Sequence, residues 1–325
     1  MMIIDFHNHY YPDAYLRELE QGNTNARLER DPEGRLQVHY PGDYNVVARG
    51  HRDLDERIRA MNEAGVDVHA FSLTTPGVHI EPRARGIELA RLVNDEFAAA
   101  VERYPGRFAA LAALPLQDPA AAVEELERAV GLGHRGVLLF SNINGRTLDE
   151  AEYFPLFQRI AELDIPAFIH PTNPSALGQL ADYRLTALMG FQFDTTAAVT
   201  RLIFAGVLER LPDLKLVVGH LGGTIPFMAE RVERGYEVYP ECREHISRPP
   251  SEYFRRIYID TVNFDAAALR LGLDFAGADR IVFGSDYPHQ VGYIDRALDA
   301  VRAMPVNDAE RERILGGNAG ALLKL

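Results

Sequence analysis

Five side chains in this sequence share a type and a setting that suit metal chemistry. Each follows a short apolar run: they are His7, His9, His170, His220 and Asp286. Residues two apart on a β-strand point to the same face, so the imidazoles of His7 and His9 can reach one ion. Three of these four imidazoles together with the carboxylate would suit Zn²⁺, with Mn²⁺ or Fe²⁺ as competitors. The pattern predicts one divalent cation that would acidify a bound water or polarise a substrate oxygen.

The segments that must position these residues alternate between short apolar runs and longer stretches of helical period. The eight apolar runs are 3–6, 66–73, 108–116, 136–140, 165–169, 214–219, 257–261 and 280–284. The helical stretches include 54–64, 84–103, 119–132 and 151–163. This alternation is typical of βαβ units, and eight of them predict an α/β fold of the TIM (β/α)₈ barrel type. Because this fold places its active site at the carboxyl ends of the strands, the five side chains would meet at one rim.

The length of 325 residues fits one barrel, so we interpret residues 1–325 as a single metal-dependent barrel domain. Two connections are too long for ordinary βα loops, and both follow runs that carry histidines. In residues 21–49, alternating residues on either side of positions 32–34 predict a small β-hairpin insertion after the first strand. Residues 172–195 begin with turn-forming residues and are a candidate lid.

The composition limits the classes of binding partner and the cellular compartment that we expect for this protein. The formal net charge of −13 argues against nucleic acid, which is bound by clustered Lys and Arg, and favours a small-molecule substrate. No stretch approaches the roughly 20 apolar residues of a membrane span, and the start of the chain lacks the pattern of a signal peptide. The single cysteine, Cys242, can form neither an intrachain disulfide nor a thiolate cluster and is interpreted as structural. We therefore expect a cytoplasmic protein without membrane contact.

Four motifs extend this interpretation by resemblance. They are Ile4-Asp5-Phe6-His7-Asn8-His9, Phe168-Ile169-His170-Pro171, Val218-Gly219-His220-Leu221-Gly222-Gly223 and Phe283-Gly284-Ser285-Asp286-Tyr287-Pro288-His289. In type and order, along nearly the whole chain, they resemble the amidohydrolase superfamily and within it the amidohydrolase 2 family, which includes aminocarboxymuconate-semialdehyde decarboxylase. The resemblance implies that His7, His9, His170 and Asp286 are the metal ligands. It also implies that His220 activates the metal-bound water.

The sequence also indicates how many metal ions to expect. Many members of the wider superfamily bridge two ions through a carbamylated lysine at the end of the fourth strand, but residues 137–146 contain no lysine here. The two lysines of the chain, Lys215 and Lys324, lie at the start of the sixth strand and near the C-terminus. A mononuclear site is therefore predicted.

A carboxylate substrate would be held best by an arginine, because a guanidinium can bind a carboxylate with two hydrogen bonds. Arg49 and Arg52 follow the insertion, close to where decarboxylases of the resembled family place such an arginine; the competing interpretation is simple surface charge. His289, three residues after Asp286, is a further candidate for substrate binding. Some of these decarboxylases use another arginine beyond the sixth strand, whereas residues 237–240 contain none, so the identity of the substrate stays open.

Three functions compete for these residues. The resemblance favours a nonoxidative decarboxylase (carboxy-lyase) of a small unsaturated or aromatic carboxylic acid, in which His220 moves a proton and Asp286 relays one to the carbon that loses CO₂. Hydrolysis of an ester, lactone or amide needs the same metal, base and proton donor. A noncatalytic ligand-binding barrel would have lost a ligand or the base, and all five residues are present. By the same resemblance we expect a homodimer.

Overall fold

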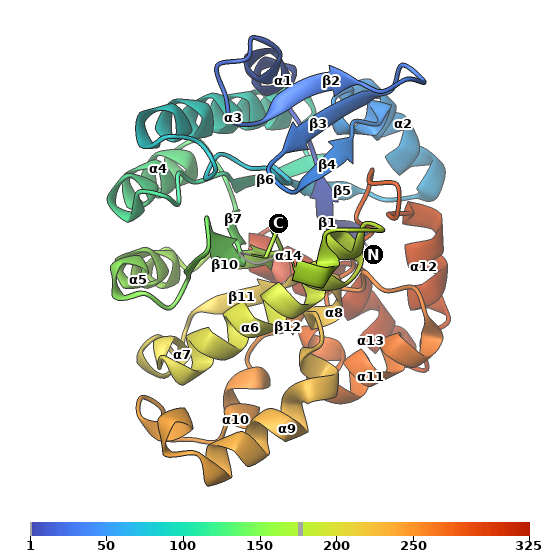
Figure 1. The fold of residues 1–325 in the computed structure, drawn as a ribbon. Helices are drawn as coiled ribbons and strands as arrows, with labels where there is room; N and C mark the ends of the chain where they lie inside the picture. Colours follow the sequence, from blue (N-terminus) through green and yellow to red (C-terminus); the bar gives the residue numbers. More distant parts are fainter. Residues whose placement is uncertain (1, 175–177) are drawn as a thin grey trace.

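The computed structural model describes residues 2–174 and 178–325. Parallel strands form its central sheet in the order β1-β5-β6-β7-β10-β11-β12. Their bounds are Ile4–His9 for β1, Val68–Ser72 for β5, Phe108–Ala112 for β6, Gly136–Phe140 for β7, Pro166–His170 for β10, Lys215–Val218 for β11 and Tyr258–Ile259 for β12. Each strand pairs in parallel with the next one of the sheet, and the sheet curls around an axis (Figure 1). This is the order that successive βαβ units produce.

The predicted eighth run closes the sheet between β12 and β1, although it is not a regular strand. The amide of Val282 donates to the carbonyl of Ile259 on one side (2.9 Å), and the amide of Phe6 donates to the carbonyl of Phe283 on the other (2.8 Å). The backbone of Asp286 is left-handed, with a φ of 59°, yet hydrogen bonding to β1 continues past it, because the amide of His9 donates to the carbonyl of Tyr287 at 2.8 Å. The result is the TIM-type barrel that the sequence predicted.

Helices cover the outside of the barrel and form the connections between its strands (Figure 1). The longer ones are α1 (Asp13–Glu20), α2 (Leu54–Ala64), α3 (Arg83–Arg103), α4 (Pro119–Gly131), α5 (Phe154–Glu162), α6 (Phe191–Phe204), α9 (Ile225–Val238), α11 (Ala266–Ala276) and α12 (Ile294–Arg302). The shorter ones are α7 (Val207–Arg210), α8 (Gly219–Gly222), α10 (Pro250–Phe254), α13 (Asp308–Glu312) and α14 (Asn318–Leu323). Among the helices of the described residues, none combines the length and the apolarity that a membrane span requires.

The helix boundaries follow from ordinary capping chemistry. Helix α2 begins where the carboxylate of Asp53 accepts hydrogen bonds from the amides of Asp55 and Glu56, and it ends at Gly65 in a left-handed conformation. The stretches predicted from helical period coincide with α2, α3, α4 and α5 to within three residues at either end. Asp118 caps α4 in the same way, whereas α3 and α5 begin without a side-chain cap and follow the amphipathic pattern alone.

Apolar side chains fill the barrel next to the rim where the histidines gather. Phe6 and Phe168 are fully buried and pack edge to face, with ring centroids 5.6 Å apart. The ring of Phe168 also lies 4.8 Å from that of His7. Burial of one such phenylalanine contributes roughly 1.5–3 kcal/mol. His7 is itself fully buried, so the ring of Phe168 restricts its orientation and excludes water from that face.

The insertion after β1 forms a small antiparallel sheet. Its strands are β2 (Arg27–Arg30), β3 (Leu36–Tyr40) and β4 (Asp43–Val46). Strands β2 and β3 are the two arms of a hairpin around positions 32–34, and β4 adds a strand that the sequence pattern did not predict. A second, shorter antiparallel pair joins β8 (Asn142–Ile143) to β9 (Arg146–Thr147).

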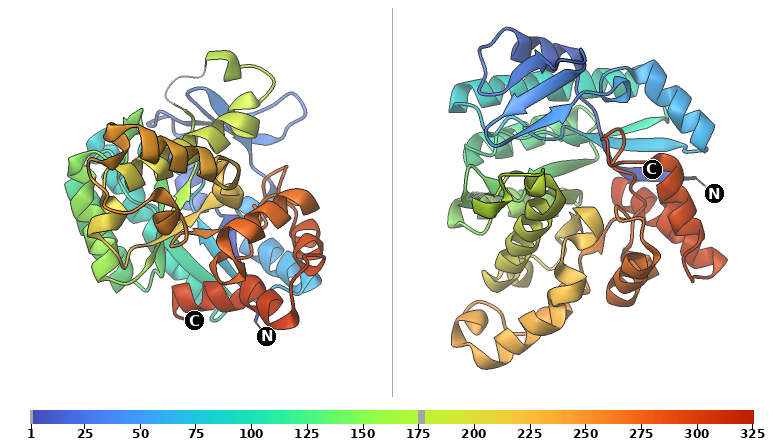
Figure 2. Two further views of the ribbon diagram at one scale, coloured as in Figure 1. Left: turned by 90° about the horizontal axis from the view of Figure 1, so that it is seen from below. Right: turned by 45° about the vertical axis from the view of Figure 1, so that its right-hand side comes forward.

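The lid candidate at residues 172–195 lies beside this insertion (Figure 2). Its positions 175–177 fall outside the described residues. The described part contains η3 (Gly178–Leu180), the π-helical turn η4 (Thr186–Gly190) and the start of α6. Arg184 forms an ion pair with Asp43 of β4 and donates to the carbonyl of Tyr44 at 2.9 Å. The two long connections thus contact each other directly.

Candidate metal centre and active site

Three ligand-type atoms meet at the carboxyl end of the barrel. The Nε2 atoms of His7 and His9 lie 3.2 Å apart, and Oδ1 of Asp286 lies 3.4 Å from the first and 3.2 Å from the second. All three residues are buried. His7 and His9 share one side of β1 because they are two residues apart, and Asp286 reaches them from the segment that closes the barrel. The structure therefore brings these three residues together.

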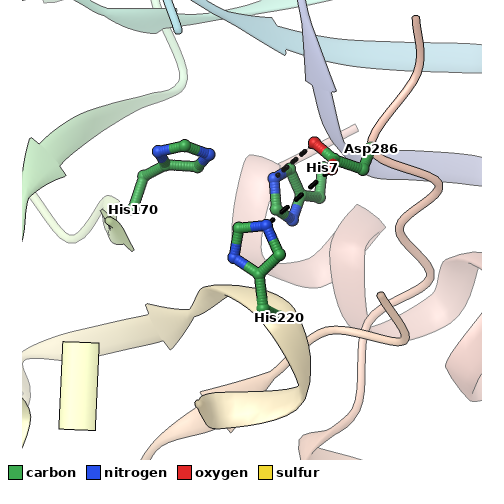
Figure 3. Close-up of side chains that lie close together, drawn as sticks. All are labelled: His7, His170, His220 and Asp286. Atoms are coloured by element: carbon green, nitrogen blue, oxygen red, sulfur yellow. Dashed lines mark ion pairs between the residues drawn. The ribbon is translucent and has the colours of Figure 1, made fainter. Parts of the chain in front are cut away.

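His170, the last residue of β10, faces the same point. Its ring centroid lies 5.2 Å from that of His7 and 4.7 Å from that of His9. One ligand atom from each of His7, His170, His220 and Asp286 lies within 4.8 Å of all the others (Figure 3). Separate parts of the barrel thus deliver nitrogen and oxygen atoms to one location.

The outward nitrogen of each candidate imidazole ligand has a partner that fixes the ring. His7 Nδ1 lies 2.5 Å from the carboxylate of Asp260. His9 Nδ1 lies 3.1 Å from the hydroxyl of Ser72, which donates in turn to a backbone carbonyl. His170 Nδ1 lies 2.8 Å from the carbonyl of the following residue. Because each of these partners accepts, each Nδ1 carries the proton and each Nε2 presents a bare lone pair to the cluster.

This arrangement of donor atoms fits a divalent cation. Two bare imidazole nitrogens 3.2 Å apart cannot hydrogen bond to each other, and Oδ1 of Asp286 is buried with no hydrogen-bond partner among the described residues. Converging lone pairs in a buried site repel one another unless a cation lies between them. Burial also lowers the pKa of His9 to about 3, and a neutral imidazole is the form that binds metal. Three nitrogens and one oxygen match the ligands that Zn²⁺ prefers.

Asp260 belongs to this site, although the sequence pattern did not single it out. Its fully buried carboxylate pairs with His7 and accepts from the backbone amides of His220 (2.9 Å) and Leu221 (2.7 Å). Burial alone would raise the pKa of Asp260, but His7, His220 and the amide of Leu221 together outweigh burial, and the pKa is lowered. The signal was available in the sequence, because Asp260 follows three residues of the seventh apolar run much as Asp286 follows the eighth.

His220 stands on a strained turn beside the cluster. In α8, His220 and Leu221 have φ angles of 53° and 58°, a conformation that residues other than glycine rarely adopt. The hydrogen bonds from the two backbone amides to the carboxylate of Asp260 hold this turn. The imidazole Nε2 lies 3.8 Å from Oδ2 of Asp286, and Nδ1 is buried without a hydrogen-bond partner in the described part of the chain (Figure 3).

Opposite pKa shifts distinguish His220 from Asp286. Burial would raise the pKa of Asp286, but its contacts with His220 and His9 and the charge of His289 lower it well below its ordinary value. Burial would lower the pKa of His220, but the nearby carboxylates of Asp286 and Asp260 outweigh burial, and the pKa is raised. The two shifts favour a carboxylate facing an imidazolium. Of this pair, His220 is thus the better candidate to hold a proton.

His289 lies at the edge of the cluster. Its ring centroid is 5.0 Å from that of His9, and its Nε2 lies 3.1 Å from the hydroxyl of Thr74. With His9 and Asp286 it forms a second group of close ligand atoms. His289 is only partly buried, unlike His9, so its ring can contact a molecule that enters the site.

The structure does not bring Arg49 and Arg52 to the cluster. The side chain of Arg49 is 73% exposed and pairs at 2.8 Å with Asp53, the residue that caps α2. The side chain of Arg52 is 45% exposed and pairs at 3.1 Å with Asp13. Both arginines line an outer cavity of about 740 Å³ to which the clustered residues do not contribute. In this structure acidic partners hold both guanidinium groups at the surface.

Both lysines lie away from the site. Lys215 and Lys324 pair with the same carboxylate, that of Asp164, at 2.5 Å and 3.1 Å. Asp164 precedes β10, whereas the candidate ligand His170 ends that strand. Neither lysine can therefore bridge two ions at the histidine cluster.

The fold and the site define a class: this is a barrel of the kind that metal-dependent enzymes use, with nitrogen and oxygen ligands at the carboxyl ends of its strands. A family model described as amidohydrolase (Amidohydro_2) matches residues 4–325. The chain belongs to this family, as its motifs indicated.

Relatives of known activity match most of the chain. It is 32% identical over 280 residues to a 2-amino-3-carboxymuconate-6-semialdehyde decarboxylase of Dictyostelium discoideum. That match covers 84% of this chain and 77% of the relative. It is 35% identical over 303 residues to a gamma-resorcylate decarboxylase of a Rhizobium species, which covers 88% and 92%. It also resembles the crystal structure of a dihydroxybenzoic acid decarboxylase from a Polaromonas species with bound manganese and the inhibitor 2-nitroresorcinol. That match has a TM-score of 0.79 and 29% identity, and it covers 100% of this chain and 97% of the other.

Proposed function

We propose that this protein is a metal-dependent, nonoxidative decarboxylase of a small unsaturated or aromatic carboxylic acid. The observation that carries the proposal is the convergence of His7, His9, His170 and Asp286 beside His220. The decarboxylases that match most of the chain support the same reaction. The proposal thus combines a donor set that fits one cation with relatives whose names share one reaction type.

His7, His9, His170 and Asp286 would hold the ion. When bound, a divalent cation supplies Lewis-acid chemistry at substrate oxygens. The three nitrogens favour Zn²⁺, whereas the manganese bound in the Polaromonas relative favours Mn²⁺, and Fe²⁺ is a third candidate. Reconstitution with each metal separately, followed by an assay of turnover, distinguishes these ions.

Decarboxylation breaks the bond between the carboxyl carbon and its neighbour. The electron pair left on that neighbour takes up a proton as CO₂ departs, so the chain must hold a proton close to this carbon. The two carboxylate oxygens of Asp286 face different residues: Oδ1 faces His7 and His9, whereas Oδ2 faces His220. We infer that His220 holds the proton and that Asp286 relays it to the carbon.

We assign a contact with the substrate to His289. Its Nε2 forms a hydrogen bond with the hydroxyl of Thr74, and this bond fixes the orientation of the ring next to His9. The group is partly buried at the edge of the cluster, where a substrate would enter. A polar group held in a fixed direction provides specificity at low conformational cost.

Release of CO₂ by the metal-loaded protein tests the proposal. A panel of aromatic and unsaturated acids is assayed for CO₂, and lactones, esters and amides are assayed in parallel for hydrolysis. CO₂ from an acid supports the proposal. Hydrolysis without CO₂ would establish the competing hydrolase, and a loaded protein that turns over no compound of either panel would favour a noncatalytic binding role.

The variant His220→Ala tests the proton-holding residue. We expect kcat to fall by roughly 10²–10⁴-fold, the range that one acid–base group contributes, while metal content stays at the wild-type level. The matched control is His245→Ala, because the side chain of His245 is 62% exposed and lies outside the cluster. Undiminished turnover by His220→Ala would contradict the role assigned to this residue.

Exposed apolar side chains support the proposal that the chain forms a homodimer. Leu188, Met189, Phe193 and Phe227, on η4, α6 and α9, are each at least 43% exposed. Large exposed apolar side chains are candidates for an interface between two copies of the chain. We also propose that residues 1–325 act as one cytoplasmic domain, with the segment 172–195 as a lid.

A further inference from the structure

Arg57 is a fully buried arginine of α2 whose donors point toward the metal-binding strand. Its Nη1 donates to the side-chain oxygen of Asn8 at 2.7 Å, and its Nη2 donates to the backbone carbonyl of His9. The same Nη2 donates to the carbonyl of Gly50 at 3.0 Å. One guanidinium therefore joins the end of β1 to the turn that leads into α2.

A second set of contacts leads from Arg57 to the segment that carries Asp286. Nη1 of Arg57 lies 3.0 Å from Nδ1 of His69, and Nε2 of His69 faces the carboxylate of Asp5 at 3.6 Å. That carboxylate accepts from the hydroxyl (2.5 Å) and the amide (3.1 Å) of Ser285. Since Ser285 directly precedes Asp286, buried polar contacts extend from Arg57 to candidate ligands on two different segments.

The turn at Gly50 takes part in the same arrangement. A Cβ at Gly50 would clash with the hydroxyl of Tyr287, so the turn can approach this ring only with bare backbone. The guanidinium carbon of Arg57 lies 5.1 Å from the centroid of the Tyr287 ring. The next residue of the turn, His51, has its ring 4.9 Å from that of His289. Arg57 thus fixes the turn that carries His51, whose ring packs against that of His289.

We propose that Arg57 is a positioning residue that sets the direction of His9 and of the Asp286 segment, and so the spacing of the metal ligands. This inference rests on the proposed metal centre. A guanidinium suits the task because its planar fork donates to several fixed acceptors at once, which neither an ammonium group nor an apolar side chain can do.

The surroundings of Arg57 differ from those of an arginine that only stabilises its helix. Arg59, one half-turn further along α2, is exposed and pairs with Glu56 and Glu63 of the same helix. Arg57 instead contacts backbone carbonyls, an amide oxygen and a neutral imidazole. Burial lowers the pKa of Arg57 to about 10, so the group is still a cation at neutral pH.

The test compares Arg57→Met and Arg57→Lys with the control Arg59→Met. Dissociation constants for Zn²⁺ and Mn²⁺ are measured by competition with a chelator, well below the Tm of each protein. We expect Arg57→Met to raise the metal Kd by about 10–100-fold, the usual effect of removing a group that orients a ligand. Arg57→Lys should recover part of this loss, because an ammonium replaces one of the donors, and Arg59→Met should bind metal like the wild type.

The outcomes separate this inference from the proposed reaction. A folded Arg57→Met protein with the wild-type metal Kd would overturn the inference. Where that variant does not fold, Arg57→Lys decides: a raised Kd supports the positioning role and a wild-type Kd overturns it. A wild type that binds metal but releases no CO₂ contradicts only the decarboxylase assignment, because the Kd comparison does not depend on turnover. A wild type that binds no divalent ion overturns both.

Discussion

At the scale of single residues, one carboxylate joins a candidate metal ligand to His220, the residue proposed to hold the proton. Asp260 pairs with Nδ1 of His7, which leaves Nε2 of that ring free for a cation. It also accepts from the amides of His220 and Leu221, which holds the left-handed turn beneath the imidazole. The buried side chain of Asp260 therefore orients both the ring of His7 and the turn that carries His220.

The substitution Asp260→Asn tests this double role. We expect the metal Kd to rise by roughly 10–100-fold and kcat to fall, because the amide is neutral and offers one acceptor oxygen where the carboxylate offers two. Chelator competition and the CO₂ assay measure the two effects. The control Asp265→Asn should bind metal like the wild type, since Asn still caps α11 at that position. Wild-type metal affinity in Asp260→Asn would show that His7 needs no such partner.

The histidine cluster could be predicted from the sequence because strand-end residues of a barrel share one rim, whatever the details of packing. Arg57 could not be found in this way. It lies in a helix of ordinary amphipathic sequence, and only the packing of α2 against β1 shows that it is buried. The direction of Arg49 could not be predicted either, because its ion pair with Asp53 depends on side-chain geometry that sequence periodicity does not encode.

At the scale of elements, α8 decides where His220 lies. The turn ends at Gly222, whose φ is 77°, and a Cβ there would lie 2.8 Å from the side chain of Ile259 in β12. The backbone of α8 therefore packs directly against the neighbouring strand. This close approach places His220 beside the histidine cluster rather than on the outside of the barrel.

The substitution Gly222→Ala should disturb both stability and catalysis. We expect the free energy of unfolding to fall by about 1–3 kcal/mol, since strain and a clash coincide, and kcat to fall because the turn must shift. The control is Gly22→Ala, whose φ is 75° but whose Cβ would meet no described atom within 4 Å. It should cost roughly 1–2 kcal/mol and leave kcat unchanged. Urea unfolding and the CO₂ assay measure both; equal losses with unchanged kcat would contradict this view of α8.

Strands and helices of the barrel could be predicted because length and period distinguish them. Strand β4 was missed because it is only four residues long, and its residues are all half-buried although polar and apolar side chains alternate along it. The irregular closure near Asp286 was also invisible, because a left-handed aspartate leaves no trace in the sequence. Such details arise from pairing with distant segments.

At the scale of the whole molecule, histidines outside the site connect stability to pH. Burial lowers the pKa of His79 to about 3 and that of His134 to about 4, against roughly 6.5 in an unfolded chain. The unfolded state therefore binds more protons than the folded state below about pH 6.5. Their effect on stability is absent above that pH and destabilises the fold progressively as the pH falls toward 4.

We expect each of these histidines to lower the free energy of unfolding by about 1.4 kcal/mol per pH unit between roughly pH 6 and pH 4. The variant His134→Gln, which keeps a side-chain donor for the carbonyl of Ala129, should show a shallower decline. The exposed His245→Gln should decline like the wild type. Urea unfolding at several pH values provides the slopes, and the same slope in His134→Gln and wild type would contradict the burial of a neutral imidazole.

The central claim is that one divalent cation binds where His7 and His9 converge with His170 and Asp286. Metal content measured by mass spectrometry, on wild type and on the double variant His7→Ala, His9→Ala after identical reconstitution, tests it most directly. We expect one ion per wild-type chain and none retained by the double variant. No ion in the reconstituted wild type, or the same content in both proteins, would contradict the metal centre.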